Sequence, residues 1–249
     1  MVPMMQLLID NSNGRTKFLL CLNGELQEER RVLPTAELSA PAVRTLLAGW
    51  EYDSALICSV VPAAQSILQQ ALAPCPVRFL TAQNAQHIDF SAYAGRTTLG
   101  ADRVADVLGL LTYGRSPALA IDAGTAITFD LLTDIGGTPT FTGGIIAPGL
   151  HTMAEALHAR TAQLPQVYAE CPACAIGSTT TEAMQSGLVL GLRGMVRELI
   201  TTVAAELGER PYVVATGGDA ALLHDLLPEL IDAVDPLLTF RGLALAARA

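Results

Sequence analysis

Charged residues are scarce in this sequence, and basic residues are the scarcer kind. Charged residues make up 16% of the 249 positions, and Asp and Glu outnumber Lys and Arg by 24 to 15, which gives a net charge of −9. Binding to nucleic acid or to an anionic membrane surface depends on a basic protein surface. Both functions are therefore disfavoured, and an anionic substrate needs a local group of cations.

Long hydrophobic runs are absent as well, although 51% of the residues are hydrophobic. No stretch approaches the roughly 20 apolar residues that cross a bilayer. The apolar segment 1–9 has no basic residue ahead of it and leads directly into Asp10, which is typical of a first strand and not of a signal peptide. The sequence therefore predicts a compact cytoplasmic protein with a sizeable core.

Cysteine is sparse and odd in number, which favours a reducing compartment over a disulfide scaffold. Cys171 and Cys174 have the spacing of a redox or zinc half-site, but Cys21, Cys58 and Cys75 are scattered and supply no second pair. A redox site also needs a strand before the first cysteine and a helix starting at it. We favour a structural role for the pair, and a zinc-stapled interaction protein is the alternative.

Hydrophobic periodicity and turn residues predict alternating strands and helices. Strands are expected at 4–9, 16–22, 25–33, 55–61, 77–80, 118–121, 126–132, 140–146 and 212–215. Helices are expected at 39–50, 63–72, from about 101 onward, and at 150–162, 180–207 and 219–227. Asn23-Gly24 predicts a tight hairpin, and Ser39 is the expected N-cap of the first helix. Each half therefore has three strands followed by alternating helix and strand.

Two aspartates, Asp10 and Asp122, each end an apolar strand and begin a turn of small residues, 112 positions apart. Such a turn brings backbone N–H groups, hydroxyls and a metal-seeking acid to one point, as a polyphosphate with Mg²⁺ requires. The repeat predicts two related α/β domains, 1–116 and 117–249, that face each other across a nucleotide cleft.

Several motifs resemble one known family in their order and spacing. They are Ser59-Val60-Val61-Pro62, Tyr93 seven residues before Gly100-Ala101-Asp102-Arg103, Asp122-Ala123-Gly124-Thr125-Ala126-Ile127-Thr128, 143–149, Ala175-Ile176-Gly177 with Thr180, and Gln185-Ser186-Gly187. The two aspartate turns and Ala215-Thr216-Gly217-Gly218-Asp219 resemble the wider superfamily of that family. The sequence is similar to type III pantothenate kinases, which belong to the superfamily of acetate and sugar kinases, heat-shock ATPases and actin.

The resemblance implies a fold and an activity. The fold is α/β, with two duplicated actin-like (ribonuclease H-like) domains, each a mixed sheet with helices, around a central nucleotide cleft. The activity is ATP-dependent phosphorylation of pantothenate to 4'-phosphopantothenate, the first step of coenzyme A biosynthesis.

The resemblance also implies the pantothenate site. Asp102 is similar to the family's proton acceptor, although a carboxylate at this position is also common in the first turn of a helix. Tyr93 and the segment Gly100, Ala101, Asp102 and Arg103 bind the substrate. Arg103 suits its carboxylate because a guanidinium offers two hydrogen bonds, and a surface ion pair with Asp106 is the alternative. Thr180 reaches the substrate from the neighbouring subunit, which implies a homodimer.

For ATP, the resemblance implies that Asp10 holds Mg²⁺ through water and that Asp122 binds a monovalent cation, K⁺ or NH₄⁺. Thr125 contacts an ATP phosphate. The first turn lines the phosphates with Asn11, Ser12, Asn13, Gly14, Arg15, Thr16 and Lys17.

This first turn departs from the family pattern Asp-x-Gly-Asn-Thr-x-x-Lys. Ser12 replaces the glycine and Gly14 replaces the threonine, while Asp10, Asn13 and Lys17 are kept. If the glycine serves a positive φ or a close phosphate approach, Ser12 hinders it, and Gly14 removes a hydroxyl. A turn re-formed around Gly14 and a weaker nucleotide site are both open. Two further alternatives are a non-catalytic ligand-binding regulatory protein and a kinase of another small alcohol.

Overall fold

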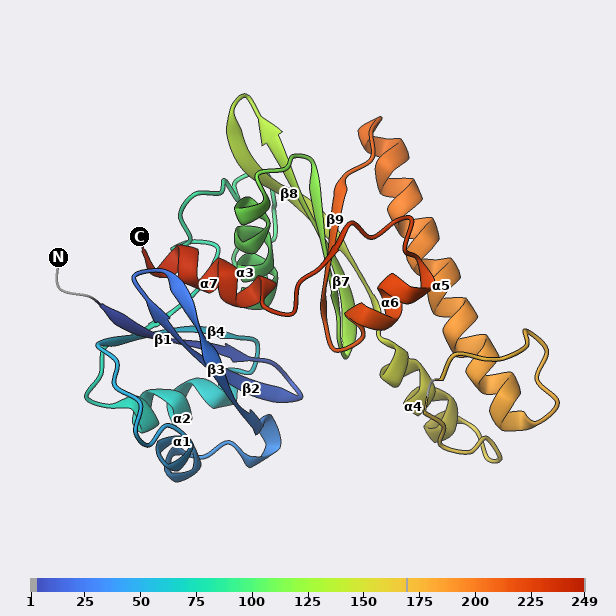
Figure 1. The fold of residues 1–249 in the computed structure, drawn as a ribbon, viewed down its shortest axis with the longest axis horizontal. Helices are drawn as coiled ribbons and strands as arrows, with labels where there is room; N and C mark the ends of the chain where they lie inside the picture. The colour runs from blue at the N-terminus through green and yellow to red at the C-terminus, as the bar shows by residue number, and fades with distance from the viewer. Residues whose placement is uncertain (1–3, 169, 249) are drawn as a thin grey trace. The chain divides into compact units, whose positions relative to one another are not determined.

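The computed structural model describes residues 4–168 and 170–248, and they form two compact units (Figure 1). Unit 1 comprises Met1–Ser116, Asp130–Gly143 and Leu237–Ala249, and unit 2 comprises Pro117–Phe129 and Gly144–Pro236. Within the described ranges, no helix combines the length and apolar character needed to cross a membrane. The division of the chain into 1–116 and 117–249 stays a prediction.

The first five-stranded sheet lies in unit 1 and has the order β3-β2-β1-β4-β5. Its strands are β1 (Met5–Asn11), β2 (Arg15–Leu22), β3 (Glu25–Pro34), β4 (Ser54–Ser59) and β5 (Val77–Phe79). The first three are antiparallel neighbours, whereas β4 runs parallel to both β1 and β5. The turn between β2 and β3 has φ values of 50° at Asn23 and 85° at Gly24, as the predicted hairpin requires.

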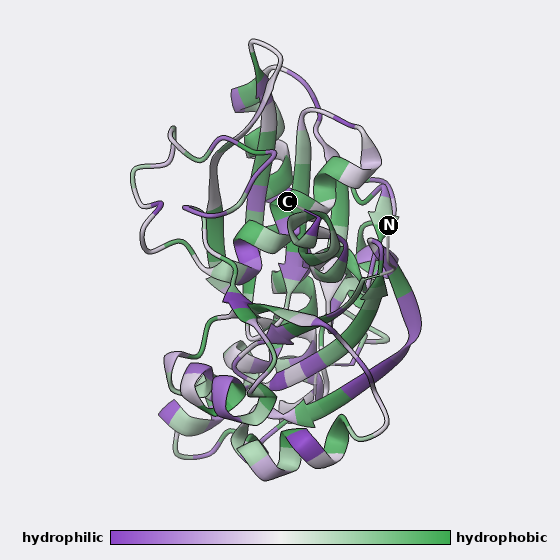
Figure 2. Cartoon of the chain, turned by 90° about the vertical axis from the view of Figure 1, so that its left-hand side faces the viewer, coloured by the Kyte–Doolittle hydropathy of each residue, from purple (hydrophilic) through white to green (hydrophobic). Residues whose placement is uncertain are grey.

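The helices of unit 1 are α1 (Ala40–Leu46), α2 (Pro62–Leu72), α3 (Ala101–Leu110) and α7 (Leu238–Ala247), with short 3₁₀ turns at Thr35–Glu37 and Leu111–Tyr113. Ser39 caps α1 as predicted, because its side chain accepts a hydrogen bond from the Ala42 N–H. Leu7, Ile9 and Ile57 of the central strands are fully buried in a cluster to which α1 and α2 also contribute. In the hydropathy colouring of Figure 2, apolar residues concentrate in strands and helices, and the loops are more polar.

The second five-stranded sheet has the order β10-β9-β6-β7-β8. It is formed by β6 (Ala118–Ala123), β7 (Ala126–Ile135), β8 (Thr138–Pro148), β9 (Tyr212–Gly217) and β10 (Ala233–Val234). Counted from the third strand of each half, this order is the same as that of the first sheet, and β6 pairs in parallel with β9 as β1 does with β4. The predicted α/β duplication is therefore present in the strand topology.

The remaining helices belong to unit 2 and are α4 (Leu150–Arg160), α5 (Thr180–Leu207) and α6 (Ala220–Leu226). The 28-residue helix α5 begins after Thr179, whose side chain accepts a hydrogen bond from the Glu182 N–H, and ends at Gly208 with a φ of 76°. These boundaries lie within a few residues of the predicted ones, except that α1 ends at Leu46 and not near residue 50.

No element was expected after residue 227, but the structure has the strand β10 and the helix α7 there. The helix α7 packs closely against α3, because a side chain added at Gly109 would collide with the Leu238 carbonyl, and one added at Gly242 with the Ala105 carbonyl. Two glycines thus let the C-terminal helix approach the helix that carries Asp102.

Candidate active site

In unit 1, Asp10 lies near the end of β1 and is buried, with 5% of its surface exposed. The antiparallel register places it opposite Lys17 of β2, and the Lys17 Nζ donates to Asp10 Oδ2 at 2.7 Å. The strand pairing therefore brings together a carboxylate and a cation that lie seven residues apart in the sequence.

The turn after Asp10 is closed by its own side chains. The Ser12 N–H and hydroxyl both donate to the Arg15 carbonyl, at 3.1 and 3.0 Å. The Asn11 amide donates to the Thr16 hydroxyl at 2.7 Å and accepts from the Ser59 hydroxyl at 2.7 Å. This network ties the turn to the end of β4.

Neither substituted position of this turn needs the conformational freedom of glycine. Ser12 is not among the described non-glycine residues with positive φ, and Gly14 has no left-handed φ either. A Cβ added at Gly14 would meet no atom within 4 Å. Ser12 is thus accommodated without backbone strain, and its hydroxyl helps to close the turn.

Asp102 lies in the first turn of α3, after Gly100 as N-cap, and its Oδ1 accepts a hydrogen bond from the Arg103 N–H at 2.8 Å. Gly100 leaves room for this carboxylate, because a Cβ at position 100 would lie only 2.5 Å from Asp102 Oδ1. A glycine at the N-cap therefore gives Asp102 space that a larger residue would occupy.

Burial raises the pKa of Asp102, and the negative charge of Asp10 raises it further. The hydrogen bond from the Arg103 N–H lowers this pKa but does not outweigh the two. Burial also raises the pKa of the Cys58 thiol well above its usual range, with Asp10 and Asp102 adding to the effect. A helix N-terminus alone would lower the pKa of an aspartate. Asp102 is thus a first-turn acid in an environment that disfavours its charge, as carboxylates at functional sites often are.

Arg103 is buried, with 7% of its surface exposed, and pairs with Asp130 of β7. Its Nε donates to Asp130 Oδ1 at 2.7 Å, and its Nη2 lies 2.7 Å from the same oxygen. Burial lowers the pKa of Arg103, but Asp130 and the Tyr93 side chain outweigh this, so that the net shift is upward. The alternative of a surface ion pair with Asp106 is wrong, because Arg103 is buried; Asp106 accepts a hydrogen bond from the Thr239 hydroxyl at 2.7 Å.

Phe141 of β8 joins Tyr93 and Arg103 in unit 1. The Tyr93 and Phe141 rings meet edge to face with centroids 5.1 Å apart, and the Arg103 Cζ lies 5.7 Å from the centre of the Phe141 ring. The backbone of Asp89 fixes this arrangement by donating to the Pro139 carbonyl at 2.8 Å and accepting from the Phe141 N–H at 2.9 Å. We call Tyr93, Arg103, Asp130 and Phe141 the Arg103 cluster.

Sequence reasoning missed Asp130 and Phe141. Asp130 is fully buried inside an otherwise largely apolar strand, and a charged residue in such a strand is itself a signal, because buried charges are usually paired. Phe141 carries no comparable signal in the sequence.

In unit 2, three turns meet around Asp122, which lies near the end of β6. The Thr125 carbonyl accepts hydrogen bonds from the Gly149 N–H at 3.0 Å and from the Thr152 hydroxyl at 2.7 Å. Gly217 has a φ of 90°, and a Cβ there would collide with Asp122 Oδ1 and with the Ala123 carbonyl. The turns that follow β6, β8 and β9 are therefore packed together through backbone contacts that require small residues.

Asp219 follows the third of these turns, and its N–H donates to the Ala123 carbonyl at 3.0 Å. Burial raises the pKa of Asp219, opposed by the nearby His151. The Gly217-Gly218-Asp219 segment thus belongs to the same group of turns as Asp122.

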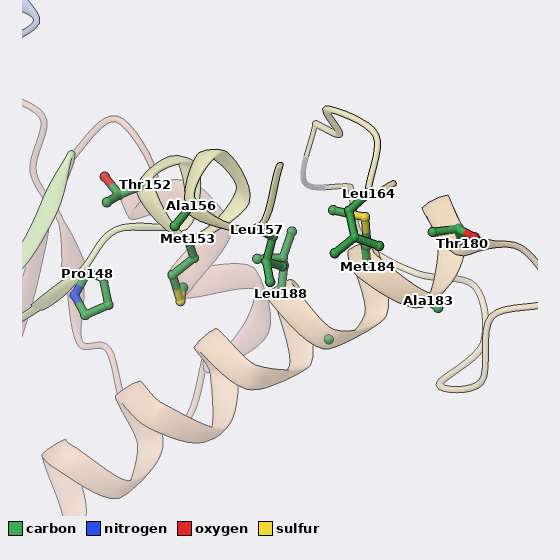
Figure 3. Close-up of a pocket in the computed structure, with 11 residues that line it drawn as sticks. Pro148, Thr152, Met153, Ala156, Leu157, Leu164, Thr180, Ala183, Met184 and Leu188 are labelled. Carbon is green, nitrogen blue, oxygen red and sulfur yellow. The ribbon is translucent and has the colours of Figure 1, made fainter. Parts of the chain in front are cut away.

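Thr180 is exposed at the first position of α5 and lines an open apolar groove of about 700 Å³ in unit 2. Figure 3 shows side chains of α4 and α5 around this groove, among them Leu157, Met184 and Leu188. The other lining residues are Pro148, Thr152, Met153, Ala156, Leu164, Ala183 and Gly187. None of these residues is charged, so the groove suits an apolar surface and not a phosphate.

Cys171 and Cys174 are exposed and carry free thiols. Throughout the residues that the structure describes, no group of three or more His, Cys, Asp or Glu is arranged to hold a metal ion.

The strand order of both sheets places the chain in a class of duplicated α/β proteins, and solved structures support this. The component A of (R)-2-hydroxyglutaryl-CoA dehydratase from Acidaminococcus fermentans has a TM-score of 0.54 at 16% identity, with 98% of this chain and 96% of that one covered. A candidate sugar kinase from Cytophaga hutchinsonii has a TM-score of 0.51 at 11% identity, with 96% and 98% covered. A candidate Baf family transcriptional activator from Campylobacter jejuni has a TM-score of 0.58 at 20% identity, with 97% of both chains covered.

These likenesses define the fold alone, and the fold is the duplicated actin-like one that the sequence predicted. Sequence comparison is more specific. The family model for type III pantothenate kinase matches residues 6–202. The type III pantothenate kinase of Akkermansia muciniphila is 45% identical over 98% of both chains, and that of Methylacidiphilum infernorum is 37% identical over 96% of this chain and 86% of its own length. The chain belongs to the type III pantothenate kinase family.

Proposed function

We propose that this protein is a pantothenate kinase that transfers the γ-phosphate of ATP to the primary hydroxyl of pantothenate, the first step of coenzyme A biosynthesis. The observation that carries the proposal is the pair Asp102 and Arg103 at the start of α3, in a chain that is 45% identical to a type III pantothenate kinase. Adjacent residues thus offer a carboxylate with a raised pKa and a buried guanidinium.

Asp102 is the proposed proton acceptor. As the substrate oxygen attacks the γ-phosphorus, its O–H bond breaks and the proton moves to the Asp102 carboxylate, while the bond from the γ-phosphorus to the bridging oxygen breaks and ADP leaves. A raised pKa suits this role, because a stronger base takes the proton more readily as long as it is still ionised at the working pH.

Arg103 is the proposed partner of the pantothenate carboxylate, within a substrate site formed by Tyr93 and 100–103. Its Nε is occupied by Asp130, so two-point binding of a carboxylate falls to the Nη1 and Nη2 edge of the guanidinium. The Tyr93 ring, held against Phe141, offers an apolar face and a hydroxyl beside it.

For ATP, the Asp10 turn and the Asp122 turn are the proposed contact segments. Asp10, with Lys17 beside it, fits a water-mediated Mg²⁺ contact, since Mg²⁺ usually keeps several waters and takes one or two carboxylates plus phosphates. Asp122 fits K⁺ or NH₄⁺, because its Oδ1 and the Ala123 carbonyl oxygen both lie against Gly217. Bound cations would neutralise phosphate charge, and the Thr125 hydroxyl would donate to a phosphate oxygen.

A homodimer with Thr180 contributed across the interface is the proposed assembly. Two features support it: Thr180 is exposed, and it borders the apolar groove of α4 and α5.

The test is a coupled assay of ADP formation with pantothenate, Mg²⁺ and K⁺, with Asp102→Asn as the inactive control. ADP formation that requires pantothenate and is lost in the control supports the kinase. ADP formation with sugars or other small alcohols in place of pantothenate would indicate another acceptor. Binding of ATP and pantothenate without any turnover would refute the enzyme and indicate a regulatory protein.

A further inference from the structure

Asp130 and Arg103 form a buried ion pair that no part of the proposed mechanism uses directly. Asp130 has no exposed surface, and the Arg103 side chain is 8% exposed. Asp130 comes from β7, 27 residues further along the chain, and belongs to the segment Asp130–Gly143 of unit 1. The partner of Arg103 is therefore supplied by the second strand of the second sheet.

The contact with Asp130 decides which edge of the guanidinium is available. A guanidinium carries five N–H bonds in one plane, and a carboxylate binds in two-point fashion only to neighbouring N–H groups. The Nε–H is directed at Asp130 Oδ1. Only the Nη1 and Nη2 edge then remains for a second carboxylate.

Nη2 still has hydrogen-bonding capacity. It lies 2.7 Å from Asp130 Oδ1, yet it is buried and makes no hydrogen bond of acceptable geometry within the described part of the chain. Nη2 carries two N–H bonds, so it can take a further acceptor beside Asp130 Oδ1. A bound carboxylate would supply one.

Two other members of the Arg103 cluster limit how the guanidinium can move. The Phe141 ring centre lies 5.7 Å from the Arg103 Cζ, and the nearby Tyr93 side chain helps to raise the pKa of Arg103. Phe141 and Asp130 both belong to the segment 130–143, so one short segment supplies two of the contacts of Arg103.

We infer that Asp130 is a positioning residue, which turns the Nη1 and Nη2 edge of Arg103 toward the substrate carboxylate and so selects a carboxylate-bearing alcohol. This inference rests on the proposed function. The competing explanation is that Asp130 only neutralises a buried charge. It predicts the opposite effect on affinity, because removing the negative charge would strengthen the attraction of Arg103 for an anion.

The experiment compares Asp130→Ala and Asp130→Asn with the wild-type enzyme on two substrates, pantothenate and its neutral analogue with –CH₂OH in place of the carboxylate. For positioning, Asp130→Ala should raise the KM for pantothenate about tenfold or more, as expected when a charged hydrogen bond is lost. Asp130→Asn, which keeps an acceptor oxygen, should restore part of this loss. The KM for ATP and the kinetics of the neutral analogue should stay near wild type.

Asp106→Asn is the matched control, because Asp106 is a buried acid on the same helix as Arg103 and accepts a hydrogen bond from the Thr239 hydroxyl. It should change the KM for pantothenate little. An unchanged or lower KM for pantothenate in Asp130→Ala would overturn the inference, as would equal losses on both substrates. If Asp130→Ala fails to fold, Asp130→Asn decides alone. A raised KM for pantothenate in that variant supports positioning, and an unchanged KM contradicts it. A wild-type enzyme without pantothenate-dependent turnover refutes the proposed function itself, which the variants cannot do.

Discussion

At the scale of single residues, the position of Asp102 in a helix and its burial have opposite effects on its pKa. The first turn of a helix stabilises a carboxylate, but burial and the charge of Asp10 act more strongly, and the pKa of Asp102 is raised. A folded-state pKa above the unfolded one means that ionising Asp102 costs stability. This cost is absent below the unfolded pKa and fully present above the folded one.

Asp102→Asn should therefore lower turnover by about 10²- to 10⁴-fold, the range for loss of a general base, while ATP binding persists. The same variant should melt at a higher temperature than the wild type at neutral pH. This gain should shrink as the pH falls from the raised folded-state pKa of Asp102 to the unfolded value near 4. Steady-state kinetics and thermal unfolding at several pH values measure both effects; a loss of stability at neutral pH would favour the purely structural role.

Substitution of the single residue Gly14 tests whether the altered first turn weakens ATP binding. A Cβ at Gly14 meets nothing within 4 Å and the backbone is not left-handed, so a larger residue fits. Gly14→Thr restores the family's hydroxyl and should lower the KM for ATP by roughly two- to tenfold, the worth of one hydrogen bond.

Gly14→Ala is the control for Gly14→Thr. It should raise the free energy of unfolding by about 0.4–1 kcal/mol, because alanine reduces the conformational entropy of the unfolded chain. The KM for ATP should not change. Equal KM values for the two variants would show that the hydroxyl does not reach the nucleotide.

At the scale of elements, the turns that follow β6 and β9 are packed through a glycine with a left-handed backbone. Gly217→Ala places a Cβ against Asp122 Oδ1 and the Ala123 carbonyl at a φ of 90°, and should cost about 1–3 kcal/mol of stability. If Asp122 binds K⁺ as proposed, the substitution should also weaken activation by K⁺, because Asp122 has to move.

Its neighbour provides the matched control for this prediction. Gly218 has no left-handed φ, and a Cβ there meets nothing within 4 Å. Gly218→Ala should therefore change stability by less than about 0.5 kcal/mol. Thermal unfolding and K⁺ titration compare the two variants, and equal behaviour would contradict the packing argument.

Some of the secondary-structure elements were predicted correctly and others were missed, and particular residues explain the difference. Ser39 followed by Pro41, and the Asn23-Gly24 pair, are local signals, and the structure places α1 and the hairpin where they indicated. The helix α7 was missed although Leu238, Leu243 and Ala246 are buried, because its close packing depends on Gly109 of a distant helix. Local signals predict local structure, and helix–helix packing is not local.

At the scale of the whole molecule, the strand order that both sheets share is the dominant feature. Assembly is the next level, and complementation tests it. A mixture of Thr180→Ala and Asp102→Asn chains, denatured and refolded together, should regain turnover that neither variant shows alone. In a mixed dimer, one site then receives Asp102 from the first chain and Thr180 from the second.

The same two variants refolded separately and then mixed provide the control. Turnover should be lower there, because the subunits of the proposed dimer would exchange only as fast as it dissociates. Size-exclusion chromatography with light scattering measures the oligomeric state. Failure of co-refolded chains to regain activity would indicate that Thr180 acts within its own subunit or not at the site.

The sequence by itself determined the fold class, the family and most of the elements. The reason is that strand alternation, capping residues and the spacing of the Asp-containing motifs are all short-range patterns. Strands 4–9 and 16–22 were among these elements, whereas the register that places Asp10 opposite Lys17 comes from the structure.

Only the tertiary structure decided what surrounds those motifs. It paired Arg103 with Asp130, raised the pKa of Asp102 and closed the first turn with the hydroxyl of Ser12. Burial and the contacts of a buried charge are set by segments that lie far apart in the chain, and no local pattern records which of them meet.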